Sequence, residues 1–321
     1  MTTTMPRPAG GAAAPMGYVA LARTLHANLR QVLLGAPVAV TTAVVAALSG
    51  GHLLIEDVPG VGKTLLARAL ALSLGARLAR VQGHPDLLPT DVTGVSVYLQ
   101  DAGTWEFRPG PVFAHVVLVD ELNRTPPRTQ SALLEAMEEQ QVSVDGESWP
   151  LPRPHMVLAT QNPLGQLGTH PLVESQLDRF ALSTAIGYPD EEAEAQLVLH
   201  HGGREALPDL RPVCAVEDWA RAIAVSRQVH VAPEVAAYAV AITRATRTGA
   251  GVRLGASPRA SIALVRSAQA HALLYGRPYV SPVDVQAMAV PCLAHRLMTD
   301  GVAGGAAVVA GLVRSLPAPR P

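Results

Sequence analysis

The sequence predicts an α/β fold in which a parallel sheet with helices on both faces precedes a smaller, all-helical domain. Two observations predict this fold. Short apolar runs typical of buried strands alternate with amphipathic helical stretches up to about residue 190. Beyond that point the strand patterns disappear, and alanine-rich helical stretches replace them.

Composition indicates a folded chain whose core is built from small aliphatic side chains. Of the 321 residues, 49% are apolar, 16% are charged and only 4% are aromatic, which excludes an extended disordered protein. The formal net charge is -1 and no basic stripe stands out, so nucleic-acid binding is not indicated. The two cysteines, Cys214 and Cys292, do not indicate a disulfide framework, and we expect a reducing, cytoplasmic location.

One uncharged stretch, residues 36–55, is long enough to cross a membrane. It contains polar and glycine residues and divides into a helix and a strand, so we expect no stable membrane insertion. The apolar run at 301–313 is too short to span. Residues 1–16 lack the apolar centre of a signal peptide, and we expect a flexible tail there.

The first domain is expected over residues 17–190. Periodicity predicts its helices over residues 18–35, 37–48, 65–75 and 130–139. Buried strands are expected over residues 52–56, 115–119, 156–160 and 180–186. Turn signals at Asp101-Ala102-Gly103 and Asp145-Gly146 predict two hairpins, over 95–108 and 141–150.

Prolines and glycines cluster between residues 188 and 212, which predicts a domain boundary. We expect a linker over 191–212, a second domain over 213–315 and a tail over 316–321. Helices of the second domain are expected over residues 216–228, 233–247, 258–274 and 282–298.

A glycine-rich loop joins the strand at 52–56 to the following helix. Its sequence, DVPGVGKT, fits the phosphate-binding pattern except that Asp57 replaces the first glycine. Gly60 and Gly62 allow backbone N–H groups to turn toward phosphate oxygens, and the helix dipole points the same way. Lys63 is the only lysine of the chain, which favours a phosphate ligand over a ligand-free turn. The residues expected to contact nucleotide are Asp57, Val58, Pro59, Gly60, Val61, Gly62, Lys63, Thr64 and Leu65.

A second chemical motif follows the apolar strand at 115–119, which ends in Asp120 and Glu121. Ligands of open α/β folds bind at the carboxyl ends of the strands. Asp120 and Thr64 are therefore expected to hold Mg²⁺, and Glu121 to orient the attacking water. The alternative, a cap for the next helix, is less favoured because a phosphate loop lies upstream.

Three further polar residues are candidates for the same chemistry. Asn162 could hold the attacking water, or could simply form a turn before Pro163. Arg179 could act on a neighbouring subunit as an arginine finger, or could pair with a nearby acid. Arg259 begins a helix of the second domain and could reach back to the phosphates, or could be solvated there.

Together these motifs resemble the MoxR family of AAA+ ATPases, in the clade with a hairpin inserted in helix 2. The resemblance extends from about Leu33 to Leu297. The segments that carry it are EDVPGVGKT (56–64), LLPTDVTGVSVY (87–98), FRPGPVF (107–113), VDELNRTPPRTQSALLEAMEE (119–139), VSVDGESWPLPRP (142–154), ATQNP (159–163), ESQLDRF (174–180) and GASPRA (255–260). The chain departs from the family pattern at Ala36, Gly165, His170, Val173 and Ser175.

The resemblance implies an AAA+ αβα nucleotide-binding domain followed by a helical lid, with ATP/ADP and Mg²⁺ as cofactors. By resemblance the site residues are Lys63 and Thr64 (Walker A), Asp120 and Glu121 (Walker B), Asn162 (sensor 1), Arg179 (arginine finger), Arg259 (sensor 2), and Val32 and Gly35 (adenine pocket). Residues 95–108 would be the helix-2 insert and 141–150 the pre-sensor hairpin, near a pore or partner face.

The resemblance also implies how such a protein acts. A finger that works between subunits implies a homo-oligomeric ring, expected to be a hexamer. The implied function is Mg²⁺-dependent ATP hydrolysis coupled to chaperone-like remodelling, activation or metal-cofactor maturation of a client, with a von Willebrand factor A domain protein as partner. Three alternatives stay open: a nucleotide-gated scaffold with little turnover, a chelatase-type motor subunit and a nucleic-acid motor.

Overall fold

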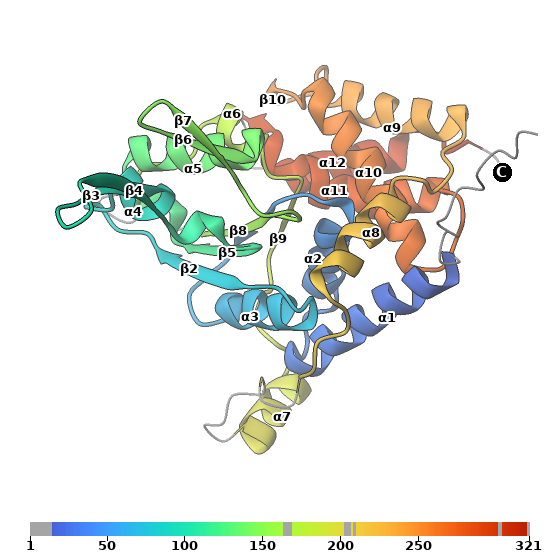
Figure 1. Cartoon of the computed structure of the whole chain (residues 1–321). Helices are drawn as coiled ribbons and strands as arrows, with labels where there is room; N and C mark the ends of the chain where they lie inside the picture. The colour runs from blue at the N-terminus through green and yellow to red at the C-terminus, as the bar shows by residue number, and fades with distance from the viewer. Residues whose placement is uncertain (1–14, 163–168, 202–206, 208–209, 301–303, 320–321) are drawn as a thin grey trace, which may run out of the picture.

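A parallel sheet forms the centre of the first half of the chain. The computed structural model describes residues 15–162, 169–201, 207, 210–300 and 304–319. Five strands pair in the order β2–β5–β8–β1–β9, all parallel (Figure 1). The strands are β1 (Leu53–Glu56), β2 (Leu78–Gln82), β5 (Val116–Asp120), β8 (Met156–Gln161) and β9 (Leu182–Thr184). This order brings the carboxyl ends of β1, β5 and β8 together at one edge.

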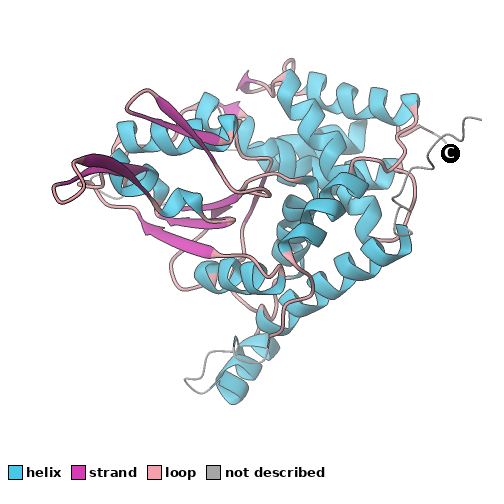
Figure 2. Ribbon diagram, in the orientation of Figure 1, coloured by secondary structure: helices cyan, strands magenta, loops and turns pink. Residues whose placement is uncertain are grey.

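Alternate side chains of the middle strands enter two separate apolar layers. Leu53 and Ile55 of β1 pack with α1 (Pro15–Val32), α2 (Pro37–Ser49) and α3 (Lys63–Ser73), whereas Leu54 packs in the opposite layer with α5 (Pro127–Glu139). Successive strand residues point to opposite faces, so the apolar residues of one strand supply both layers. Figure 2 shows the sheet between the two sets of helices. The helices of this half are α1 (Pro15–Val32), α2 (Pro37–Ser49), α3 (Lys63–Ser73), α4 (Pro89–Thr93), α5 (Pro127–Glu139) and α6 (Glu174–Leu177), with short 3₁₀ turns η1 (Pro111–Phe113) and η2 (Leu122–Arg124).

Both hairpins expected from the sequence are present. One consists of β3 (Gly94–Leu99) and β4 (Thr104–Pro109), and the other of β6 (Gln141–Val144) and β7 (Glu147–Pro150). Asp145 and Gly146 have φ values of 53° and 84°, the left-handed geometry that a two-residue hairpin turn requires. In Figure 1 the two hairpins lie at the left, away from the helices of the second half.

Helices dominate the second half of the chain, as expected. They are α7 (Glu191–His201), α8 (Val216–Ser226), α9 (Pro233–Ala245), α10 (Pro258–Leu274), α11 (Pro282–Leu293) and α12 (Gly305–Ser315). A short antiparallel pair, β10 (Val252–Leu254) and β11 (Met298–Thr299), adds a small strand element to these helices.

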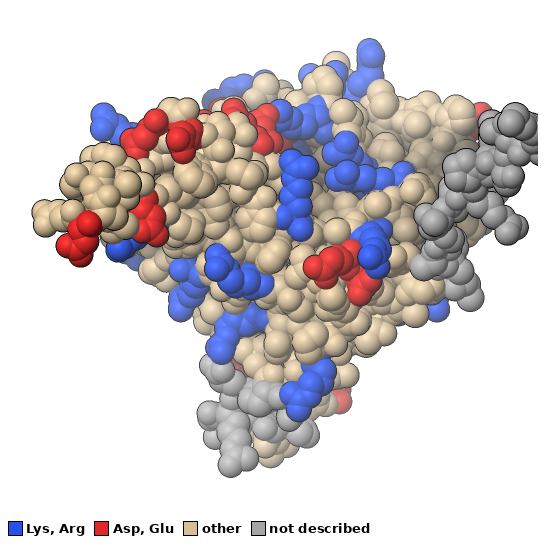
Figure 3. Space-filling view, in the orientation of Figure 1, with Lys and Arg blue, Asp and Glu red and all other residues tan. Residues whose placement is uncertain are grey.

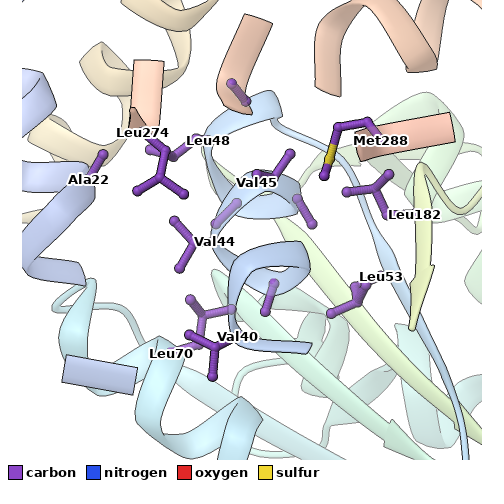
Figure 4. Close-up of a cluster of buried hydrophobic side chains, with 14 of the residues drawn as sticks. Ala22, Val40, Val44, Val45, Leu48, Leu53, Leu70, Leu182, Leu274 and Met288 are labelled. Atoms are coloured by element: carbon purple, nitrogen blue, oxygen red, sulfur yellow. The ribbon is translucent and has the colours of Figure 1, made fainter. Parts of the chain in front are cut away.

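The apolar layer beside α1 and α2 continues into the helices of the second half. Val40, Val44 and Leu48 of α2 lie in one buried cluster with Leu274 of α10 and Met288 of α11 (Figure 4). The indole Nε1 of the buried Trp219 on α8 donates to the Ala47 carbonyl at 2.9 Å. The two halves therefore share one core instead of burying separate ones.

Several elements differ from the expectations. Strand β2 was not expected, because its sequence LARVQ has no continuous apolar run of the kind that marks the other strands of the sheet. Helix α7 occupies the first half of the expected linker, and three glutamates stabilise its first turn. Helix α11 ends at Leu293, not at 298, since Pro291 removes a backbone donor from its last turn.

Other ends differ only slightly. Helix α1 begins at Pro15, inside the expected tail 1–16, and β9 is shorter than the expected 180–186. The uncharged stretch 36–55 divides between α2 and β1, as expected. Within the described residues, no helix combines the length and apolarity needed to cross a bilayer.

Candidate nucleotide site

A cavity of about 570 Å³ opens at the carboxyl edge of the sheet, where β1, β5 and β8 end. Its lining combines four segments that lie far apart in the sequence. The lining residues are Pro59, Gly60, Gly62, Lys63, Thr64, Leu65, Arg68, Arg80, Gln82, Asp120, Glu121, Thr160 and Asn162. The structure thus gathers most of the expected phosphate-loop residues, both strand-end acids and Asn162 around one space.

The loop that precedes α3 has the backbone of a phosphate cradle. Gly60 and Gly62 have φ values of 88° and 101°, which L side chains rarely adopt. A Cβ on either glycine would meet no atom within 4 Å, so the space in front of the loop is open. The Lys63 Nζ donates to the carbonyls of Asp57 at 2.6 Å and Val58 at 3.0 Å. Burial lowers the pKa of Lys63, and the carboxylates of Asp57, Asp120 and Glu121 partly offset that effect.

Asp57 has a different position from the one expected. Its carboxylate is buried and does not line the cavity. One oxygen accepts from the Val58 N–H at 2.8 Å, and the other accepts from the N–H groups of Ile186 and Gly187 at 2.6 and 2.7 Å. Asp57 therefore ties the start of the loop to the segment after β9, a role no local motif reveals. Val58 and Val61 do not line the cavity either.

The two acids at the end of β5 each contact an arginine. The Asp120 carboxylate is buried and accepts from the Arg80 Nε at 2.7 Å. The Glu121 carboxylate accepts from the Arg124 Nη1 at 2.8 Å and from the Gln82 amide at 3.4 Å. Arg80 also donates to the Gln82 Oε1 at 3.2 Å, so the two acids belong to one network.

The backbone of Glu121 is held in a strained conformation. Its φ of 57° is uncommon for a residue with a side chain. Its N–H donates to the Thr160 Oγ1 on β8 at 2.8 Å, which fixes the turn to the neighbouring strand. A Cβ at Gly83 would lie 2.3 Å from the Glu121 carbonyl, so only glycine fits beside this turn.

The residues at the cavity fit a nucleotide with a divalent cation. The glycine loop leaves open a space that phosphate oxygens would fill, and Lys63 supplies positive charge there. Thr64 and Asp120 provide a hydroxyl and a carboxylate at the same cavity, which are hard oxygen ligands suited to Mg²⁺. Within the described ranges, no group of three or more His, Cys, Asp and Glu side chains forms a metal-binding cluster.

Arg179 and Arg259 lie together but outside this cavity. The Arg179 Nε lies 3.0 Å from the Glu138 Oε2, and the Arg259 Nη2 donates to the other oxygen of the same carboxylate. The hydrogen bond from Arg259 holds the pKa of Glu138 below its ordinary value. Arg259 therefore does not reach its own phosphate loop, and Arg179 does not pair with its neighbour Asp178.

Asp178 instead connects the Arg179 segment to the second half. Its carboxylate accepts from the Ser257 hydroxyl at 2.9 Å and from the buried Arg296 at 2.8 Å. Arg296 also donates to the Phe180 carbonyl at 2.7 Å. The position of Arg179 is thus fixed to the helices that carry Arg259.

Val32 and Gly35 do not line the cavity. Val32 is buried in the core, because it lies on the inward face of the last turn of α1. A Cβ at Gly35 would lie 3.2 Å from Pro189 and Ala193, so this glycine permits close contact with the start of α7. The expected departure at Gly165 lies outside the described residues, whereas the His170 N–H donates to the Asn123 carbonyl at 2.6 Å.

Four lining residues were not expected: Arg68, Arg80, Gln82 and Thr160. Three of them had a signal in the sequence. Arg68 lies four residues after Thr64 on one helix, and such residues share a face. Arg80 and Gln82 share a face of β2 with the spacing of a strand, but only once β2 itself is recognised.

Comparison with known proteins agrees with this geometry. Residues 52–182 match the family described as "ATPase family associated with various cellular activities (AAA)", and residues 244–308 match an AAA lid domain. The uncharacterized protein YeaC of Bacillus subtilis is 46% identical over 271 residues, covering 84% of this chain and 85% of its own.

Two further relatives are similar over most of their length. Chaperone MoxR1 of Mycobacterium tuberculosis is 36% identical over 301 residues, covering 89% of this chain and 79% of its own. A crystal structure from Cytophaga hutchinsonii, named as an ATPase, superposes with a TM-score of 0.87 at 31% identity and covers 95% of this chain and 97% of its own. The chain therefore belongs to the MoxR family of AAA+ ATPases, and its enzymatic activity is ATP hydrolysis.

Proposed function

We propose that this protein couples Mg²⁺-dependent ATP hydrolysis to chaperone-like remodelling of a client protein, acting as a homo-oligomeric ring in the cytoplasm. The observation that carries the proposal is the single cavity at which the glycine cradle, the sole lysine and the paired acids meet. The name of the relative chaperone MoxR1 supports the remodelling role. A hexamer that works with a von Willebrand factor A domain protein is the proposed assembly.

Each cavity residue has a proposed task. The backbone N–H groups of the loop and the Lys63 ammonium bind the β- and γ-phosphates. Thr64 and Asp120 hold Mg²⁺, which when bound neutralises charge on the phosphates. Glu121 orients and polarises the attacking water, and Asn162 holds that water in place. To bind Mg²⁺, the Asp120 carboxylate has to exchange its present partner, Arg80.

The positions of Arg179 and Arg259 support an active site completed by a neighbouring subunit. Both arginines bind Glu138, and neither lines the phosphate cavity of its own chain. We therefore assign both to the face that meets the next subunit's nucleotide. This assignment replaces the expectation that Arg259 acts on its own phosphates. An arginine supplied in trans accelerates phosphoryl transfer by about 10³–10⁵-fold in other NTPases.

Mg²⁺-dependent ATP hydrolysis per subunit, measured over a wide protein concentration range, tests the proposal. We expect the specific rate to rise as rings assemble, and Lys63→Ala and Glu121→Gln to abolish it. Equal mixing of Glu121→Gln with Arg179→Ala restores activity if the arginine acts in trans, because some interfaces then hold both wild-type residues. Hydrolysis by Glu121→Gln at the wild-type rate would contradict its role. Nucleotide-dependent assembly without hydrolysis would favour a scaffold instead.

A further inference from the structure

The two hairpins, together with α4 and α5, enclose a groove of about 880 Å³ that the nucleotide chemistry does not use. It is larger than the phosphate cavity and shares no lining residue with it. Its lining includes Val95 and Trp105 of the first hairpin, Val144 and Trp149 of the second, and Glu135 of α5.

Aromatic side chains gather at this groove in a chain that has few of them. Two of the three tryptophans and two of the three phenylalanines, Trp105, Trp149, Phe107 and Phe113, lie in or beside it. Phe107 and Trp149 stack with ring centroids 4.6 Å apart and so join the two hairpins. This contact fixes the walls of the groove relative to each other without filling the space between them.

Trp105 is not needed for that contact and lies open to solvent. It is 71% exposed, and its ring lies beside that of Tyr98, which is 49% exposed, with ring centroids 5.4 Å apart. Exposed aromatic faces of this kind are costly in water and are typical of binding surfaces. The aromatic faces are also suited to the guanidinium or ammonium group of a ligand.

The charged side chains that line the groove are all acidic. Glu135, Asp145 and Glu147 line it, and among its described lining residues none is lysine or arginine. None of these three carboxylates forms an ion pair with another described residue. In Figure 3, Asp and Glu side chains lie over the hairpins at the left of the molecule, with a few Lys or Arg side chains beside them. Such a surface attracts cations and repels the phosphates of a nucleic acid.

The backbone around the groove can pair with an extended chain. Each hairpin is a sheet of only two strands, so each leaves unpaired N–H and C=O groups along its outer edges. An extended peptide can add to such an edge and place alternate side chains in the groove.

We infer that the groove binds an extended segment of the client in which arginine or lysine alternates with apolar residues. The cationic groups would pair with Glu135, Asp145 and Glu147, and one of them would lie on the Trp105 face. The inference rests on the proposed function in one respect, namely that the protein acts on another protein.

Two fluorescein-labelled peptides of about twelve residues test this inference by fluorescence anisotropy with the full chain. Both peptides have Leu or Val at every second position. One peptide carries Arg at the positions between them, and the other carries Glu there. We expect the affinity for the Arg peptide to exceed that for the Glu peptide by about tenfold or more. We also expect the binding of the Arg peptide to weaken as the salt concentration rises. The triple variant Glu135→Gln, Asp145→Asn, Glu147→Gln should abolish this preference, and Asn is compatible with the positive φ at position 145.

A matched variant separates the groove from the overall charge of the protein. Glu217→Gln, Glu234→Gln, Asp300→Asn removes three exposed carboxylates from the second half and should leave the preference intact. Trp105→Ala should weaken the binding of the Arg peptide about tenfold. It should leave the melting temperature of the protein unchanged, because the Trp105 side chain is exposed.

Three results would overturn the inference: equal binding of both peptides, loss of preference in the variant of the second half, or a change of oligomeric mass in the groove variant without a change in peptide binding. The last would identify the groove as a face between copies of this chain.

ATP hydrolysis by the groove variant should equal that of the wild type, because its substituted residues lie outside the phosphate cavity. Failed peptide binding with intact hydrolysis would refute only this inference, whereas absent wild-type hydrolysis would refute the proposed function.

Discussion

Arg80 is the residue whose contacts bear most directly on metal binding. Its guanidinium pairs with the buried carboxylate of Asp120, which is the acid we assign to Mg²⁺. A cation therefore already neutralises Asp120 in the absence of metal. Bound Mg²⁺ and Arg80 would compete for the same carboxylate, so Arg80 sets how strongly the protein depends on the metal.

We expect Arg80→Met to make the protein more dependent on Mg²⁺-ADP for its stability. Asp120 would lose its partner, at a cost of about 1 kcal/mol or less because Arg80 is half-exposed. Mg²⁺-ADP would then raise the melting temperature of the variant more than that of the wild type, since no guanidinium has to be displaced.

Thermal unfolding in EDTA and in Mg²⁺-ADP measures both effects. Arg77→Met is a suitable control, because Arg77 is also exposed and precedes the same strand but donates to the Phe113 carbonyl. An equal gain from Mg²⁺-ADP in the wild type and Arg80→Met would show that Arg80 and the metal do not compete.

Contiguous motifs account for the site residues that the sequence could predict. Asp120 and Glu121 lie at the end of β5, and Lys63 and Thr64 begin α3 after the glycine loop, so local pattern and chemistry agree at both places. Arg80 could not be predicted in the same way, because its position follows from the pairing of β2 with β5, some 40 residues further on. Arg80 contacts Asp120 because the sheet places their two strands side by side, and no single segment of the sequence indicates this contact.

At the scale of elements, the phosphate loop depends on a strand that is remote in the sequence. Asp57 accepts from the backbone N–H groups of Ile186 and Gly187, which follow β9. The phosphate loop is thereby fixed to the edge of the sheet that β9 forms. The Arg179 segment lies directly before the same strand. The family pattern predicted Asp57 as a nucleotide contact, but only the pairing of β1 with β9 gives it this anchoring position.

We expect Asp57→Asn to lower both stability and nucleotide affinity. An amide cannot accept all three backbone N–H bonds, and an unsatisfied buried donor costs about 1–3 kcal/mol. Urea unfolding should show a loss of about 2 kcal/mol, and the affinity for ADP should fall in parallel. Asp86→Asn, at an exposed carboxylate, is the control for the change of charge. Reduced ADP affinity with unchanged stability would instead indicate direct contact between Asp57 and the nucleotide.

The elements that the sequence predicted are those with strong local patterns. The Asp101-Ala102-Gly103 turn between β3 and β4, the Asp145-Gly146 turn and the apolar run 116–119 of β5 each predict their structure from local sequence. Strand β2 was missed because it is a short edge strand whose Arg80 and Gln82 interrupt its apolar residues, so it lacks the continuous apolar run of a central strand. Helix α7 was missed because the prolines and glycines around it outweighed its own helix-favouring sequence.

At the scale of the whole molecule, buried histidines make stability depend on pH. Burial lowers the pKa of His52 and of His295 to about 3 each. Both ring nitrogens of His52 are engaged, since Nδ1 accepts from the Val157 N–H and Nε2 faces the Met137 carbonyl. Protonation of Nδ1 would therefore break a bond between the ring and β8.

We expect the free energy of unfolding to fall as the pH drops below about 6.5, the ordinary pKa of histidine. Between that pH and about 3 the unfolded chain binds protons that the folded protein does not, so acid favours unfolding. Each histidine would cost about 1 kcal/mol at pH 5.5. Urea unfolding at pH 7.5, 6.5 and 5.5 measures this, and His52→Gln should reduce the slope. Stability that stays constant over this range would contradict the assignment.

The shared core determines how the protein can be divided. Amphipathic periodicity shows that a helix has an apolar face but not what covers it, so the sequence suggested two units with a boundary between residues 188 and 212. Removing everything after residue 212 would strip α8, α10 and α11 from α2 and expose Val40, Val44 and Leu48 to water. A limited proteolytic cut near the boundary should therefore leave two fragments that co-elute on a sizing column and unfold in a single transition.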